Sequence, residues 1–111
     1  MNHQKLICYG RLLEVAKRMP TLESRIPRGN TYIVDQIKRA LSSAILNLAE
    51  GNSRFSNRER NRFFDISIAS IAEVSAAIDI VFAYGYIPAC INREYKEELT
   101  IAYSMIMKLK K

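Results

Sequence analysis

The side chains that most often carry catalysis or metal binding are scarce in this chain of 111 residues. It has one histidine, His3, and two cysteines, Cys8 and Cys90. A zinc site needs several such ligands, and a serine or cysteine nucleophile needs a histidine base in a fixed position. We therefore expect no metal, no cofactor and no nucleophilic catalysis. The two widely spaced cysteines also indicate a reducing compartment, so we expect a cytoplasmic protein.

Paired carboxylates are the other route to enzymatic chemistry. Glu50 and Glu73 could face one another as an acid and a base, but nothing in the sequence supplies a pocket for a substrate. A di-iron centre in a helical bundle needs two Glu-x-x-His pairs, and neither is present. The prediction is that the protein is not an enzyme.

Phosphate binding is the chemistry that the charged residues favour. Arginines cluster around a predicted helix start, where the fork of each guanidinium and the helix N-terminus both suit phosphate oxygens. Phe55 lies among them and could stack on an unpaired base or plug the end of a bundle. The candidate nucleic-acid-binding residues are Lys38, Arg39, Arg54, Arg58, Arg60 and Arg62. The alternative is a solvated arginine-rich turn paired with Glu50 and Glu59.

The distribution of charge agrees with a polyanionic partner. The formal net charge is +6. Residues 1–62 hold 12 basic and 5 acidic side chains, whereas residues 63–111 hold 5 and 6. Such an excess of cations in one half favours nucleic acid, although a soluble surface also tolerates it. No run of 18 apolar residues occurs, so we expect no membrane-spanning segment.

Four helices are predicted from apolar residues that recur at steps of three and four. They cover residues 5–18, residues 31–51, about 28 residues from Asn57, and a segment that Asn92 caps. Gly51 is read as a C-terminal cap and Ser56-x-x-Glu59 as a capping box, while Pro20 to Asn30 is read as a loop. With no strand pattern, the fold class is all-α, an antiparallel up-and-down four-helix bundle that forms one domain over residues 1–111.

The repeating apolar positions define the predicted core faces of three helices. They are Leu6, Tyr9, Leu12, Leu13 and Ala16 in the first, Ile33, Ile37, Leu41, Ala44 and Leu48 in the second, and Tyr95, Leu99, Ala102, Ile106 and Leu109 in the fourth. Beside the second face runs a polar stripe of Gln36, Arg39, Ser43, Asn47 and Glu50. It is either a solvated surface or a hydrogen-bond network with the third helix, in which Gln36, Asn47 and Glu50 are joined by Ser70 and Glu73.

The third predicted helix is apolar on nearly every side. Sixteen of the 22 residues from Phe63 to Tyr84 are apolar or aromatic. A helix of this kind needs burial on more sides than a four-helix monomer provides, so we expect a homo-oligomer. The alternative is a helix at the centre of the monomer.

Several segments together resemble a known family. They are Gln36 to Ala40, Asn47 to Gly51, Ser56-x-x-Glu59, Ser70 to Glu73 and Gly85 to Ile87. The combination is similar to the four-helix-bundle proteins encoded within intervening sequences of bacterial 23S ribosomal RNA genes. The resemblance implies an antiparallel bundle that assembles as a homopentameric ring, sometimes described as ribosomal-protein-like. A relative of the same type, the accessory protein of diversity-generating retroelements, binds nucleic acid and a reverse transcriptase.

Two functions remain open from the sequence. The first is an oligomer that holds RNA or DNA through phosphates with little sequence preference. The second is a homo-oligomeric scaffold or accessory subunit, for example of a reverse transcriptase, that docks on a protein and uses its cations only for solubility.

Overall fold

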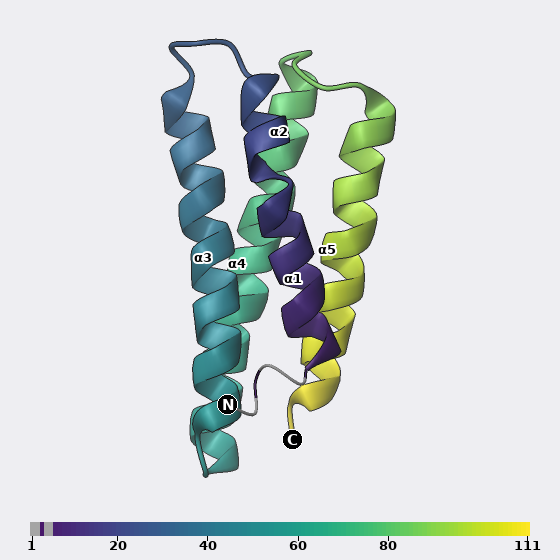
Figure 1. Ribbon diagram of the computed structural model, residues 1–111. Coiled ribbons are helices and arrows are strands. Elements are labelled where there is room, and N and C mark those ends of the chain that lie inside the picture. Colours follow the sequence, from purple (N-terminus) through teal and green to yellow (C-terminus); the bar gives the residue numbers. More distant parts are fainter. Residues whose placement is uncertain (1–2, 4–5) are drawn as a thin grey trace.

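The computed structural model describes residue 3 and residues 6–111. Its helices are α1 (Ile7–Lys17), α2 (Met19–Ser24), α3 (Thr31–Ser53), α4 (Asn57–Ala83) and α5 (Ala89–Leu109). α2 continues the direction of α1, so the two together form one of four antiparallel columns (Figure 1). Going round the bundle, α1 contacts α3, α3 contacts α4, α4 contacts α5, and α5 closes the circle on α1. The predicted all-α up-and-down four-helix bundle is confirmed.

The first column differs from its prediction in two ways. Residues from Pro20 to Asn30 do not all form a loop, because α2 occupies Met19–Ser24. Pro20 lies in the first turn of α2, where its missing N–H has no partner to lose, so it starts this helix instead of preventing it. The second difference is the buried face of α1, which consists of Cys8, Leu12 and Val15. Of the predicted face, Leu12 alone is fully buried, and the other four members are partly exposed.

α3 confirms the predicted core face, since Ile33, Ile37, Leu41, Ala44 and Leu48 are all buried. Its end is not where the sequence predicts it. The helix runs through Gly51 to Ser53, and Gly51 is itself buried. A Cβ atom on Gly51 would lie 2.8 Å from two ring carbons of Phe64 on α4. Gly51 therefore permits close contact between α3 and α4 and does not cap the helix.

α4 begins at the predicted cap, where the Ser56 side chain accepts a hydrogen bond from the Glu59 backbone N–H at 3.2 Å. By length and composition alone, α4 is the one described helix that could cross a membrane. α4 has no uninterrupted run of 18 apolar residues, because Asp65, Glu73 and Asp79 lie between its apolar residues. Only 33% of its most apolar 18-residue window is buried in the bundle. One side of this apolar helix is therefore left uncovered.

α5 starts three residues before the predicted cap, directly after Pro88. Asn92 does not cap it, because its side-chain amide instead donates a hydrogen bond to Asp79 on α4. The turn before α5 requires a positive φ of 81° at Gly85. The predicted face of α5 is confirmed for Tyr95, Leu99, Ala102 and Ile106, which are buried. Leu109 is partly exposed and packs against the core.

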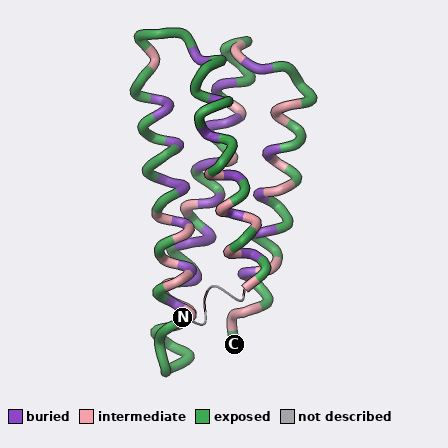
Figure 2. Tube along the Cα trace, viewed as in Figure 1, coloured by how far each residue is buried: buried purple, intermediate pink, exposed green. Residues whose placement is uncertain are grey.

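The core runs the length of the bundle, which measures 44 × 23 × 20 Å. Buried positions face inward on all four columns, and exposed positions cover the outside and the connecting turns (Figure 2). Ser67 is the single buried polar residue among those described, and its hydroxyl donates to the Ala44 backbone oxygen at 2.6 Å. This bond satisfies the hydroxyl and joins α3 to α4 inside the core.

Candidate nucleic-acid interface

The arginine cluster lies at the end of the bundle where α3 passes into α4. The connection between the two helices is short, and the Arg60 side chain holds it in place. One guanidinium nitrogen of Arg60 donates to the backbone oxygens of Asn52 at 3.1 Å and Arg54 at 3.3 Å. The Ser53 hydroxyl donates to the Glu50 backbone oxygen at 2.8 Å. Hydrogen bonds from residues of both α3 and α4 therefore hold the turn in place.

The arginines of this turn have different surroundings. Arg54 pairs with Glu50 at 3.1 Å, and its guanidinium also lies 5.0 Å from the centre of the Phe63 ring. Arg62 lies 5.6 Å from the same ring. Such cation–π contacts orient a guanidinium without consuming its hydrogen-bond donors. Arg58 and Arg62 are exposed, and neither takes part in the ion pairs formed among the described residues.

Phe55 does not plug the end of the bundle. Its exposed fraction is 101%, so the whole ring stands in solvent at the tip of the turn. Of the two roles that the sequence left open for Phe55, the structure excludes the plug within this chain. Stacking on a ligand stays a prediction.

The fold adds cations that the local sequence pattern did not point to. The C-terminus of α5 reaches the start of α4, where Asn61 accepts from the Lys111 backbone N–H and donates to its backbone oxygen. Lys110 pairs with Asp65 on α4 at 2.6 Å. Lys108 lies two residues earlier, in the last turn of α5. The signal that could have found these lysines is the antiparallel topology, which returns the end of the fourth column to the start of the third.

Lys38 and Arg39 are not part of the same surface. They lie about 22 to 24 Å from Arg54 along α3, counting 1.5 Å for each residue. Lys38 pairs with Glu23 of α2 at 2.7 Å, and this carboxylate raises the pKa of Lys38 above its usual value. We therefore define the basic end by seven residues, which are Arg54, Arg58, Arg60, Arg62, Lys108, Lys110 and Lys111.

The predicted polar residues of α3 and α4 form two separate groups. Ser43 and Ser70 share a hydrogen bond of 2.8 Å, and the Asn47 amide donates to the Ser43 hydroxyl at 3.2 Å. Farther along, the Gln36 amide donates to Glu73 at 3.3 Å. The Ser43–Ser70 and Gln36–Glu73 bonds connect the two helices at places about two turns apart along α3.

Glu50 lies outside both groups, because its carboxylate faces Arg54 and Ser53. It is also about 21 Å along α3 from Gln36, the partner of Glu73. Glu50 and Glu73 therefore do not face one another as an acid and a base.

The uncovered side of α4 is mainly aliphatic. It carries the exposed residues Ile66, Ala69, Ala76 and Ile80, together with Glu73. Ile66 and Ile80 are exposed by 38% and 41%. We call this the outer face of α4. Ala77, by contrast, is buried in the core of the chain.

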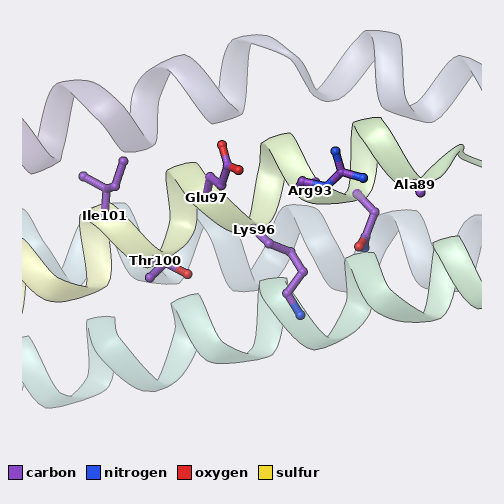
Figure 3. Close-up of a pocket in the computed structure, with 7 residues that line it drawn as sticks. Ala89, Arg93, Lys96, Glu97, Thr100 and Ile101 are labelled. Carbon is purple, nitrogen blue, oxygen red and sulfur yellow. The ribbon is translucent and has the colours of Figure 1, made fainter.

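The surface also has hollows beside the helices. A hollow of about 620 Å³ lies along α5, lined by residues from Ala89 to Ile101 (Figure 3). Its lysine, Lys96, extends toward α4 (Figure 3). There the Lys96 ammonium group pairs with the Asp79 carboxylate at 2.7 Å. This contact, with the Asn92 bond, holds the pKa of Asp79 below its usual value. Among the described residues, no group of three or more His, Cys, Asp or Glu side chains is placed to hold a metal ion.

Nearly the whole chain matches one known protein family. Residues 4–108 match the family model described as 23S rRNA-intervening sequence protein. No curated protein shows significant similarity to the chain.

Proposed function

Since the chain belongs to the 23S rRNA-intervening sequence protein family, we propose that it is a homo-oligomer that binds RNA or DNA through phosphates at the basic end. The proposed activity is binding alone, without a catalytic step and with little preference for base sequence. The observation that carries it is the meeting of two distant segments, the arginine turn and the C-terminal lysines, at one end of the bundle.

The charge balance at this end supports a polyanionic ligand. The seven cations of the basic end are accompanied by three side-chain carboxylates, Glu50, Glu59 and Asp65. Two of these carboxylates neutralise Arg54 and Lys110. Arg58 and Arg62 keep their donors directed to solvent, and α4 adds the partial positive charge of its N-terminus beside them. Phosphates bound there would release counterions from the nucleic acid, which gives affinity without base readout.

A paired substitution tests this site. We expect Arg58→Ala with Arg62→Ala to weaken binding of a mixed-sequence single-stranded RNA, measured by fluorescence anisotropy over a range of salt concentrations. The slope of log K against log salt is negative, and each lost phosphate contact should reduce its magnitude by about 0.7. Arg54 and Arg60 are left intact because they hold the turn. The matched control is Arg25→Ala with Arg28→Ala, which removes the same charge at the opposite end of the bundle.

The two double variants distinguish binding at the basic end from attraction by the net charge of the whole protein. A similar loss in both double variants would contradict the assignment to the basic end. If the wild-type protein binds neither RNA nor DNA at low salt, nucleic-acid binding itself is refuted. The function favoured in that case is the protein-interaction scaffold, for example an accessory subunit of a reverse transcriptase.

We propose further that the outer face of α4 forms the contact between copies, in a ring of five as the family resemblance implies. The support is that only 33% of the most apolar 18-residue window of α4 is buried within one chain.

Ala76→Arg places a long cation on this face and should lower the mass measured by light scattering. Ser104→Arg, at an exposed position on α5, is the control. A wild-type monomer, or an Ala76→Arg protein that stays fully assembled, would refute this interface. Ala77 is unsuitable because its side chain is buried.

A further inference from the structure

Phe55 stands apart from every other aromatic side chain described. The other large aromatics that are exposed keep between 38% and 56% of their surface in solvent, because the rest packs on the bundle. Phe55 is exposed by 101% and so packs on nothing in its own chain. A phenylalanine with no contacts in its own chain adds no packing to the monomer, and its ring is free to contact a ligand or a partner.

The turn around Phe55 is rigidly bonded. On one side the Arg54 backbone N–H donates to the Gly51 oxygen at 3.3 Å. On the other side Ser56 caps α4, and the Arg60 guanidinium binds the Arg54 backbone oxygen directly before Phe55. The backbone on both sides of Phe55 is therefore held by hydrogen bonds. A backbone ordered in advance reduces the conformational entropy that binding costs at this position.

The surroundings of the ring specify the chemistry of its partner. Phe55 follows Arg54 directly and lies three residues before Arg58, so cations stand on both sides of it in the chain. A matching ligand has a flat apolar face next to a negative charge. A nucleotide of a single strand has both, in its unpaired base and its phosphate, whereas a duplex keeps its base faces stacked internally.

We propose that Phe55 stacks on an unpaired base and makes the basic end prefer single-stranded over duplex nucleic acid. This inference rests on the proposed function, since it assigns the substrate form to the same surface. Phosphate contacts from the arginines supply the affinity common to both forms. The stacked ring supplies the difference between them.

Two RNA probes of equal length and sequence, one single-stranded and one annealed to its complement, test the proposal. Phe55→Ala should weaken binding of the single strand by roughly 5- to 150-fold, the usual range for one lost base stack. It should leave the duplex affinity within about twofold, since no charge is removed. Phe55→Leu is the matched control, because it keeps an apolar side chain but has no aromatic face. We expect it to behave like Phe55→Ala.

A spectroscopic readout checks the contact itself. The chain has no tryptophan, so Phe55→Trp places the only indole of the protein at the tip of the turn. Stacking should quench its fluorescence on addition of single-stranded RNA and preserve the affinity. Addition of the duplex should leave the fluorescence nearly unchanged.

Different experimental results would refute the stacking role of Phe55 and the proposed nucleic-acid binding. Equal wild-type affinity for both probes, or no effect of Phe55→Ala on the single strand, overturns the stacking role while nucleic-acid binding stands. If the protein binds neither of the two RNA probes nor the same probes made as DNA, both the inference and the proposed function are overturned. A fall in oligomer mass for Phe55→Ala in light scattering, with unchanged RNA affinity per chain, also overturns the inference, because the ring would then dock on a second copy.

Discussion

Gly51→Ala is the sharpest test of how closely α3 and α4 approach. In an exposed helix, replacing glycine with alanine stabilises the fold by roughly 1 kcal/mol, because the unfolded backbone loses freedom. At Gly51 the new Cβ would lie 2.8 Å from the Phe64 ring and 3.1 Å from the Cβ of Phe63. The Phe64 side chain is fully buried and cannot rotate into solvent.

The size of the effect follows from these two opposing contributions. Forcing an extra methyl group into a packed core costs about 1–3 kcal/mol. Subtracting the helix-propensity gain of about 1 kcal/mol leaves Gly51→Ala neutral to destabilised by about 2 kcal/mol. Gly10 in α1 is exposed, and a Cβ there meets nothing within 4 Å. Gly10→Ala is therefore the matched control and should gain up to about 1 kcal/mol.

Urea unfolding followed by circular dichroism measures the difference. All variants are compared at one protein concentration, because assembly would add to the apparent stability. We expect the two variants to differ by about 1–3 kcal/mol, or roughly 4 °C in Tm for each kcal/mol. Phe64→Leu removes the ring that the new methyl group meets, so Gly51→Ala should cost less in that background. Equal stabilisation by both glycine replacements would refute the close approach.

Two further predictions concern ionisable side chains. Cys90 is exposed and should react with a thiol reagent in the native state. Cys8 is buried, and burial raises the pKa of its thiol, so it should react only as the chain unfolds. Equally fast labelling of Cys8 and Cys90 in the native protein would contradict the burial of Cys8. The lowered pKa of Asp79 makes its contact with Lys96 stabilising above the ordinary carboxyl pKa of 3.8, and this stability is lost as the pH falls through the lower native value. Asp79→Asn should flatten the acid limb of a stability profile between about pH 5 and pH 2, and an unaltered profile would count against the contact.

The long helices could be predicted from sequence where the apolar pattern allowed one interpretation. In α3 an apolar series recurs every three or four residues and most of the positions between its members are polar, so the buried face was clear. In α1, apolar residues occur on two overlapping faces, and the choice between them depends on where α5 and α3 lie. The interpretation of Gly51 as a cap failed for a related reason. A glycine near a helix end has the same sequence signature whether it ends the helix or admits the ring of Phe64.

The candidate site was predictable only where it is local. Arg54, Arg58, Arg60 and Arg62 are neighbours in the chain, and a short turn was enough to group them. Their division into Arg60, which holds the turn, and Arg58, which faces solvent, depends on side-chain bonds that spacing does not reveal. The C-terminal lysines join them through a contact between residues 50 positions apart, which no local pattern indicates.

The close pairing of α3 with α4 also bears on the order in which the chain folds. These helices are consecutive and make the most extensive contact in the bundle, so their pairing requires closure of only a short loop. The contact between α1 and α5 joins the two ends of the chain, as the Arg11–Glu98 ion pair across 87 positions illustrates. We expect the α3–α4 hairpin to be formed in the folding transition state and α1 to dock late. Substitutions in the hairpin should then slow folding, whereas those between α1 and α5 should mainly hasten unfolding.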